Sequence, residues 1–316
     1  MASVLVTGGA GFIGSALVKQ LVDNGHEVTV IDNLVRGSMS NLAGYLDKIM
    51  LLTEDLRDPI KFPMLQIEKF DVVFDLAAKI SGIWGLYEDQ PSFMRENISI
   101  LLNTLEYAKD KVKHYFWISS SCIYNFDGCP LPHKEDYAFV IPKTGYDISK
   151  RFGEEIVRLY AEKYGFKYTI IRPFNVYGLN DSEESAHVIT DFWKRILEEK
   201  HNPTGKFWIL GSGRQSRNFT YIKDFVNALV FLMEQGITGT FNVGTGEETC
   251  IIDLLKLMFE IAELPFDKYI IEHKQPFKED VQKRCPDVSK ILDLGWKPKF
   301  SLRQGLEEMW REMQRN

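Results

Sequence analysis

The sequence predicts an α/β fold in which a doubly wound parallel sheet is wrapped by helices and followed by a smaller α/β lobe. Short apolar runs recur along the first half of the chain, and stretches with helical apolar spacing lie between most of them. After Arg172-Pro173 the loops lengthen, the strands shorten and the helices interleave less regularly. We therefore expect residues 1–173 to form one domain and residues 174–316 to form mainly a second lobe.

Each expected element follows from its local pattern. The apolar runs predict strands at 4–6, 28–31, 50–52, 72–75, 115–119 and 168–171. Helical spacing predicts helices at 12–23, 97–108, 148–164, 226–234, 252–262 and 302–313. Asn24-Gly25 gives the first helix a glycine stop. Residues 241–244 resemble one more core strand, so a segment near 222–246 is expected to return to the first domain. Loops are expected at 178–185 and 199–205.

Composition excludes several classes of protein. A chain of 316 residues with 45% apolar and 26% charged residues can bury a sizeable core, which excludes disordered, collagen-like and disulfide-stapled chains. The net charge of −6, without a polybasic run, predicts neither nucleic acid nor an anionic membrane as partner. The four cysteines show no metal-ligand spacing, so no metal is expected. With neither a leader nor a membrane-length apolar stretch in view, a cytoplasmic location is expected.

A glycine-rich segment joins the first expected strand to the first expected helix. Residues 7–14 read Thr-Gly-Gly-Ala-Gly-Phe-Ile-Gly, which places Gly8, Gly11 and Gly14 three residues apart. Such glycines let the backbone approach a pyrophosphate, and free amides at the helix N-terminus hold its charge. A tight turn without a ligand is the alternative. The coincidence of strand, spacing and helix favours a dinucleotide-binding loop.

An acidic residue ends the second expected strand. Asp32 lies 18 residues beyond Gly14, where its carboxylate can accept hydrogen bonds from the adenosine ribose hydroxyls. It would repel a 2′-phosphate, so the sequence predicts NAD rather than NADP as cofactor. Asp55 follows the third strand and could reach the adenine amino group, or could equally be a helix cap.

Three polar side chains form a candidate proton-transfer group. Tyr146 and Lys150 lie four residues apart, on one face of a helix. A phenol with a pKa of about 10 is a poor base at neutral pH. A neighbouring ammonium group is expected to lower that pKa, and together with the nicotinamide charge it should favour the phenolate. Ser120 follows a strand at the sheet edge that faces the ligand crevice, where it can orient a substrate hydroxyl toward Tyr146. A solvated helix face and a serine-capped turn are the alternatives.

With these motifs the chain resembles the extended short-chain dehydrogenase/reductase family, and within it the NAD-dependent nucleotide-sugar epimerases and dehydratases. The resemblance also rests on Leu76-Ala77-Ala78 and on the segments at 172–178, 217–224 and 294–298. It implies a Rossmann-type cofactor domain, a nucleotide-sugar-binding lobe, and Ser120, Tyr146 and Lys150 as catalytic triad. The cofactor contacts that it implies, besides Tyr146 and Lys150, are Gly8, Gly11, Phe12, Ile13, Gly14, Asp32, Asn33, Asp55, Leu56, Leu76, Ala77 and Ala78.

Finer motifs, among them the segments around Cys122 and His187, look like those of GDP-fucose synthases and GDP-mannose 3,5-epimerases. In those families the positions of Cys122 and His187 hold an acid/base pair that inverts carbons beside a C4 ketone. Cys122 could instead be a buried core residue, and His187 a surface residue or a simple hydrogen-bond donor. The substrate contacts implied by these resemblances are Lys79, Ser81, Gly82, Ser120, Asn175, His187, Arg195, Arg217 and Arg284.

The function that these resemblances imply is NAD-dependent oxidation at C4 of a nucleotide-linked sugar, with GDP-manno-type sugars favoured, then inversion at C3 or C5 and re-reduction. The sequence also departs from its relatives. Asp32 favours NAD where fucose synthases use NADPH, and mannose epimerases carry lysine at the position of His187. Ser121-Cys122 replaces the Asp-Glu pair of dehydratases, which disfavours dehydration.

Three other functions stay open. A dehydrogenase would release the 4-keto sugar and recycle its NADH with a second oxidant. A simple C4 epimerase would use Cys122 only for packing. A protein that senses NAD or a nucleotide sugar would need no catalysis. For each of them the family resemblance implies a homodimer, because helices matching 97–108 and 148–164 form the dimer interface of the relatives.

Overall fold

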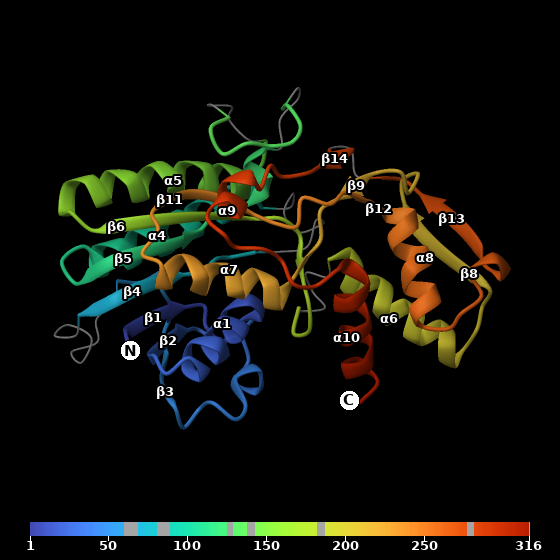
Figure 1. The fold of residues 1–316 in the computed structure, drawn as a ribbon, viewed down its shortest axis with the longest axis horizontal. Helices are drawn as coiled ribbons and strands as arrows, with labels where there is room; N and C mark the ends of the chain where they lie inside the picture. Colours follow the sequence, from blue (N-terminus) through green and yellow to red (C-terminus); the bar gives the residue numbers. More distant parts are fainter. Residues whose placement is uncertain are drawn as a thin grey trace.

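Seven parallel strands form the central sheet of the protein. The computed structural model describes residues 1–59, 69–80, 89–124, 129–137, 143–181, 187–276 and 281–315. The strand order is β11-β6-β5-β4-β1-β2-β3 (Figure 1). These strands are β1 (Ser3–Thr7), β2 (Glu27–Asp32), β3 (Ile49–Thr53), β4 (Phe70–Asp75), β5 (Val112–Ile118), β6 (Lys167–Pro173) and β11 (Gly239–Val243). The predicted doubly wound α/β class is confirmed.

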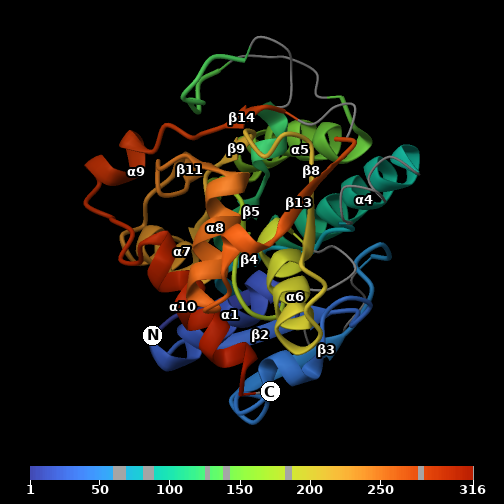
Figure 2. The same cartoon turned by 90° about the vertical axis from the view of Figure 1, so that its right-hand side faces the viewer.

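Helices cover both faces of this sheet because its strands are apolar on both sides. Val4 and Val6 of β1 belong to the core on one face, together with α1 (Phe12–Asp23) and α7 (Ile222–Glu234). Leu5 belongs to the core on the other face, with α4 (Gln90–Ala108) and α5 (Gly145–Tyr164). Figure 2 shows the two helix pairs on opposite sides of the strands.

Local signals set the helix ends. The Thr144 hydroxyl accepts a hydrogen bond from the Asp147 amide at 3.1 Å and caps the start of α5, and Gly165 ends that helix at φ 78°. α4 begins at Gln90, seven residues before the predicted start, because Asp89 caps it and Pro91 lies in its first turn. Polar residues in that first part interrupt the apolar spacing from which the later start was predicted.

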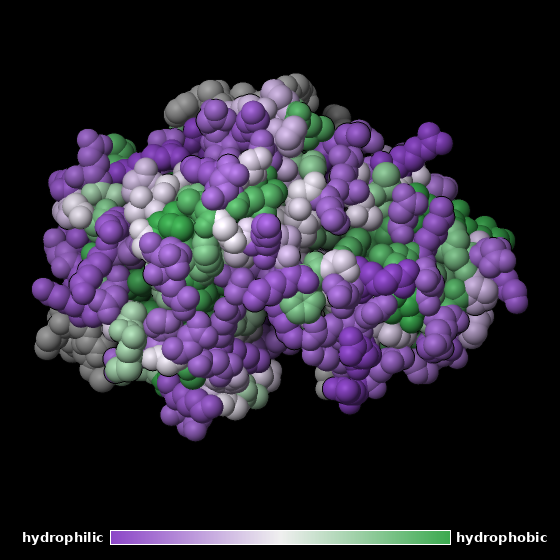
Figure 3. Space-filling view, in the orientation of Figure 1, coloured by the Kyte–Doolittle hydropathy of each residue, from purple (hydrophilic) through white to green (hydrophobic). Residues whose placement is uncertain are grey.

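The second lobe is built from α6 (Val188–His201), α8 (Ile251–Ile261), α10 (Leu302–Met313) and the parallel pair β8 (Lys206–Leu210) and β13 (Ile270–Lys274). The predicted loop at 199–205 is wrong in its first part, because α6 continues through His201. Basic side chains in that last turn suit the negative end of the helix dipole. Figure 3 shows a largely hydrophilic face, with apolar side chains grouped in smaller areas over each lobe.

Short elements connect the two lobes. Three two-residue strands, β9 (Ser216–Arg217), β12 (Thr249–Cys250) and β14 (Lys283–Arg284), form a small sheet beside the carboxyl ends of the main strands (Figure 1). The remaining elements are η1 (Met39–Leu42), η2 (Ser121–Tyr124), β7 (Val176–Tyr177), β10 (Thr220–Tyr221), η4 (Phe266–Lys268) and α9 (Ser289–Asp293).

The chain crosses between the lobes more than once. β11 pairs with β6 and α7 packs against α1, so this later segment joins the sheet formed by the first half. The sequence suggested such a returning strand, and the proposed division at residue 173 stays a prediction. Within the described ranges, no helix is long and apolar enough to cross a bilayer.

Candidate active site

The glycine-rich turn packs so closely that side chains are excluded from it. Gly8 has φ 67°, and a Cβ built on it would lie 3.0 Å from the Ala77 backbone. A Cβ on Gly14 would overlap the Gly8 carbonyl oxygen, and Gly11 is the N-cap of α1. The turn therefore presents free amides at a helix N-terminus, with room for a pyrophosphate against the backbone. Phe12 and Ile13 form the first residues of that helix, as predicted.

The acidic residue predicted to bind the adenosine ribose lies beside this turn. Asp32 is buried, and its carboxylate oxygens accept hydrogen bonds from the Ala10 amide at 2.9 Å and the Leu34 amide at 2.8 Å. These two bonds fix its orientation and leave lone pairs for ribose hydroxyls. The glycine cradle and this carboxylate together fit NAD.

Residues predicted near the adenine also come together. The Asn33 side-chain amide donates to an Asp55 carboxylate oxygen at 3.1 Å, and Leu56 is buried directly after it. Arg57, which the sequence did not single out, binds Asp55 through a 2.6 Å ion pair. The Arg57 side chain holds the pKa of Asp55 well below its usual range. Asp55 is thus an ionised acceptor at the end of β3.

The predicted catalytic side chains meet at the carboxyl ends of β4 and β5. The Ser120 hydroxyl accepts from the Cys122 amide at 3.1 Å and lies close enough to the Tyr146 phenol to lower its pKa. The Lys150 ammonium donates to the Ile118 carbonyl at 2.8 Å and lies 5.9 Å from the centre of the Tyr146 ring. Ser120 and Lys150 are buried and Tyr146 is partly buried, at the sheet edge where the strand before the glycine turn also ends.

The electrostatics of this group differ from the sequence prediction. The predicted fall of the phenol pKa is wrong for the protein alone, because burial raises the pKa of Tyr146 and outweighs the lowering by Ser120 and Arg36. Burial also lowers the pKa of Lys150 to about 8, against an opposing effect of Asp75. The positive charge of an oxidised nicotinamide, the other influence in the sequence prediction, would favour the phenolate when the cofactor is bound.

Cys122 and His187 have different partners. The Cys122 sulfur receives a long contact of 3.9 Å from the Arg284 guanidinium, and burial raises the pKa of its thiol. His187 is about half exposed and pairs through Nδ1 with Asp181 at 2.8 Å. Desolvation opposes protonation of His187, but the Asp181 carboxylate outweighs it and leaves the pKa raised. Their acid/base partnership stays a prediction.

Two of the predicted arginines lie side by side. Arg217 in β9 and Arg284 in β14 are register partners in neighbouring parallel strands. With the contact between Arg284 and Cys122, this register places a pair of cations next to the catalytic group, where they suit a diphosphate. Asn175 joins β6 to β7 at φ 34°, a left-handed conformation that asparagine tolerates, and its carbonyl accepts from the Thr220 amide at 3.2 Å.

Other predicted substrate residues bind within the protein. The Lys79 ammonium bonds Ser92 at 2.7 Å and Glu96 at 2.8 Å on α4. The Arg195 guanidinium donates to the Trp208 carbonyl at 2.7 Å and stacks 4.0 Å above the Trp208 ring. Substrate contacts of Lys79 and Arg195 stay predictions, and the predicted contacts Ser81 and Gly82 lie outside the described residues.

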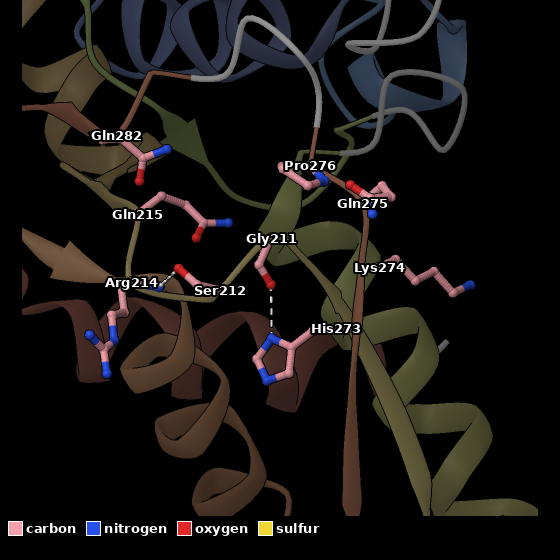
Figure 4. Close-up of a pocket in the computed structure, with 9 residues that line it drawn as sticks. All are labelled: Gly211, Ser212, Arg214, Gln215, His273, Lys274, Gln275, Pro276 and Gln282. Atoms are coloured by element: carbon pink, nitrogen blue, oxygen red, sulfur yellow. Dashed lines mark hydrogen bonds between the residues drawn. The ribbon is translucent and has the colours of Figure 1, made fainter.

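A cavity, which the sequence did not predict, opens at the carboxyl ends of β8 and β13 (Figure 4). Its volume is about 660 Å³. Gln215 and Gln282 line it and directly precede β9 and β14, the two strands that carry the paired arginines. The His273 imidazole donates to the Gly211 carbonyl at 2.8 Å and shapes the opposite wall. These residues come from separate loops without a shared motif, so their sequence carried no signal.

A second feature missed by the sequence analysis is Asp75, a buried carboxylate at the end of β4. Its sequence signal was a charged residue that ends the otherwise apolar strand Phe70–Asp75, directly before Leu76. Within the described ranges, no group of three or more histidine, cysteine or acidic residues could hold a metal ion.

Comparisons with known proteins agree with this geometry. The chain is 34% identical to UDP-glucuronic acid decarboxylase 1 of Arabidopsis thaliana over 97% of this chain and 68% of the relative. It is 32% identical to a putative UDP-glucose 4-epimerase of Methanocaldococcus jannaschii over 99% of both. The structure of a Thermotoga maritima UDP-glucose 4-epimerase with UDP-glucose matches with a TM-score of 0.87 and 32% identity over 99% of both chains.

The family model described as "NAD dependent epimerase/dehydratase family" matches residues 4–244. This range contains the glycine turn, Asp32 and the three side chains predicted to be catalytic, Ser120, Tyr146 and Lys150. NAD is therefore the cofactor that these residues are built to hold, and the chain belongs to the NAD-dependent epimerase/dehydratase family of enzymes.

Proposed function

We propose that this protein is a C4 epimerase of UDP-linked sugars, which oxidises the C4 hydroxyl and returns the hydride to the opposite face. The observation that carries the proposal is the position of Lys150: the Ile118 carbonyl holds its ammonium group at 2.8 Å, 5.9 Å from the centre of the Tyr146 ring, and Ser120 follows the same strand. Such a group can remove one hydroxyl proton and restore it after re-reduction.

Each protein group has a separate task in this proposal. Ser120 orients the C4 hydroxyl, and Tyr146 accepts its proton. Lys150 supplies positive charge and binds the nicotinamide ribose. Bound NAD supplies the hydride acceptor and then the donor. The protein keeps the 4-keto sugar in place while its ring presents the other face, so that net chemistry is inversion at C4.

The surroundings of Ser120 favour C4 inversion over other outcomes. The Cys122 thiol, with its pKa raised by burial, is a poor base for removing a proton from C3 or C5. Ser121 and Cys122 also offer no carboxylate for dehydration. We therefore propose simple C4 epimerisation in place of inversion at C3 or C5, the function that the sequence resemblances imply.

The nucleotide is proposed to be a UDP group. The relatives named above act on UDP-linked sugars by their names, and none of the three supports the earlier preference for GDP. Arg217 and Arg284 suit the diphosphate, and Gln282, which lines the cavity directly before β14, can offer its side-chain amide to a pyrimidine base. A larger purine is not needed to explain these side chains.

A panel of substrates tests the proposal. The purified enzyme is mixed with UDP-glucose, UDP-N-acetylglucosamine, UDP-glucuronate and GDP-mannose in heavy water, and products are followed by NMR. We expect conversion of a UDP-sugar to its C4 epimer without deuterium at C3 or C5. Solvent deuterium in the product would favour the C3/C5 epimerase, whereas free NADH with a released 4-keto sugar would favour the dehydrogenase.

Decarboxylation of UDP-glucuronate is the second candidate function. It is favoured by the 34% identity to the Arabidopsis decarboxylase across 97% of this chain. The same C4 oxidation would turn the uronate into a β-keto acid, whose carboxylate leaves as carbon dioxide without a further base. Carbon dioxide release from UDP-glucuronate, with no epimer formed from the other three sugars, would replace our proposal with this one.

We also propose that the protein is a homodimer formed through α4 and α5. Three large apolar side chains on these helices, Met94, Phe152 and Leu159, are 40%, 43% and 64% exposed. Exposed apolar residues gathered on neighbouring helices are typical of a protein interface. A second copy presenting the same two helices would cover them by two-fold symmetry.

A further inference from the structure

Asp75 forms a buried hydrogen-bond network below the catalytic group. The Thr7 hydroxyl donates to one Asp75 oxygen at 2.6 Å, and the Tyr115 hydroxyl donates to the other at 2.6 Å. The Thr7 oxygen also accepts from the amides of Leu76 and Ala77, both at 3.1 Å. Since Thr7 has a single hydroxyl proton and its oxygen already accepts twice, that proton points to Asp75. Both carboxylate oxygens are thus acceptors, which suits the ionised form.

Strand register places this network next to the catalytic lysine. Asp75 pairs with Thr7 of β1 on one side and with Trp117 of β5 on the other. The Lys150 ammonium lies 5.0 Å from the Trp117 ring centre and donates to the Ile118 carbonyl. All of these groups lie at the carboxyl ends of the three strands, where opposite charges on Asp75 and Lys150 stabilise each other.

We propose that Asp75 is a positioning residue that acts through Lys150, keeping its buried amine protonated and directed at the catalytic site. A buried ammonium without a nearby anion loses its proton readily. The Ile118 carbonyl gives Lys150 one neutral acceptor, so Asp75 supplies the balancing charge. Thr7 and Tyr115 hold that charge in place, and Thr7 also joins it to the strand that leads into the NAD turn. This role of Asp75 belongs to the NAD chemistry, which is the same whichever sugar is bound.

The ionisation of the pair supports this assignment. Burial raises the pKa of Asp75 to about 6, although its two hydrogen bonds and Lys150 lower it. Burial lowers the pKa of Lys150 to about 8, and Asp75 opposes that fall. Between these values both groups are charged. The groups that face the carboxylate are Thr7 from β1, Tyr115 from β5 and Lys150 from α5.

The direct test is the ionisation of Lys150, measured by NMR of lysines labelled at ¹³Cε. Lys150→Arg identifies the resonance by its disappearance, and the titration is repeated in Asp75→Asn. We expect the Lys150 midpoint near pH 8 to fall by about one pH unit or more when the carboxylate is lost. NAD affinity, measured by calorimetry, should weaken about fivefold at pH 8 in Asp75→Asn and much less at pH 6.5, since a fall of one unit in the Lys150 pKa lowers the protonated fraction about fivefold at pH 8.

Tyr115→Phe is the matched variant, because it keeps the charge and removes one hydrogen bond to it. In the wild type, the Lys150 resonance should carry a second, smaller inflection near pH 6 from Asp75. Tyr115→Phe should move that inflection upward and leave the Lys150 midpoint unchanged. An unchanged Lys150 midpoint in folded Asp75→Asn would overturn the proposal. If Asp75→Asn does not fold, Tyr115→Phe decides: a Lys150 resonance without an inflection near pH 6 that moves upward in this variant would overturn the proposal, whatever sugar the enzyme uses.

Discussion

In the proposed reaction, the charge on a single phenol decides whether the first proton can be removed. Desolvation in the protein alone holds the pKa of Tyr146 above the ordinary value, so proton removal by this residue would depend on further positive charge in the site. The Tyr-x-x-x-Lys motif predicts that the lysine lowers the phenol pKa, whereas desolvation outweighs any such lowering in the protein alone. Spacing predicted which side chains meet, whereas burial, which spacing cannot give, decides their ionisation.

Tyr146→Phe should abolish turnover while leaving cofactor binding intact. Removing the hydroxyl takes away the proton acceptor, and we expect kcat to fall by about 10²–10⁴-fold. NAD affinity should change little, because the glycine turn and Asp32 are untouched. Stopped product formation with normal NAD binding, measured by calorimetry, is the expected result. Near wild-type turnover would show that another group moves the proton, and unchanged biological activity would favour a sensor.

At the scale of elements, β5 and β6 are joined by a buried histidine whose tautomer is set by its partner. The Thr169 hydroxyl donates to the Ile237 carbonyl at 2.7 Å, so it can only accept from His114, whose Nε2 lies 2.7 Å away. Burial, with a smaller effect of Lys167, lowers the pKa of His114 to about 4. The neutral ring is therefore part of the strand pairing at working pH.

This histidine predicts a stability loss in mild acid. The unfolded chain binds a proton below pH 6.5, whereas folded His114 binds one only near pH 4, so stability falls as the pH drops through that window. We expect His114 to contribute a loss of about 2 kcal/mol in the free energy of unfolding between pH 7 and pH 5. Urea unfolding of His114→Gln, which can still donate to Thr169, should show a decline smaller by that amount. An equal decline in the free energy of unfolding of the wild type and of His114→Gln would show that His114 is not the cause of the acid destabilisation.

Sequence patterns predicted the elements of the first half better than those of the second. The first helix was placed at its observed bounds, because its apolar spacing and Asn24-Gly25 are both local signals. The start of α4 was missed, since Asp89 and Pro91 define it by capping and not by apolar spacing. α6 was not predicted. The β8–β13 pair was also missed, because its two strands pair across about 60 residues of chain and each is too short to carry a clear pattern.

The site was predicted to a similar extent. Motif residues such as Gly14, Asp32 and Tyr146 lie together because they follow strands whose ends meet at one sheet edge. Asp75 and the cavity near Gln215 were missed, since their roles arise from register and from loops brought together by the fold. The partners of Lys79 likewise follow from tertiary packing, which the Leu76-Ala77-Ala78 motif directly before it does not specify.

At the scale of the whole molecule, the exposed apolar side chains on α4 and α5 predict how two copies meet. Leu159 is the most exposed of the three, and a charge there would be costly to bury in an interface. Light scattering should give the wild type twice the 36.5 kDa of one chain, and Leu159→Glu should shift it toward that single mass. Leu294→Glu, at an exposed leucine outside these helices, is the matched control. A monomeric wild type at micromolar concentration would contradict the dimer.

In the proposed reaction, the two lobes together hold a single sugar carbon where it can lose and regain the same hydride. The most direct measurement is conversion of UDP-[4-²H]glucose by the purified enzyme with its NAD, followed by NMR of the product. We predict UDP-galactose that retains deuterium at C4, because the hydride never leaves the site. Deuterium lost to water, or carried away on free cofactor, would contradict the proposed return of the hydride.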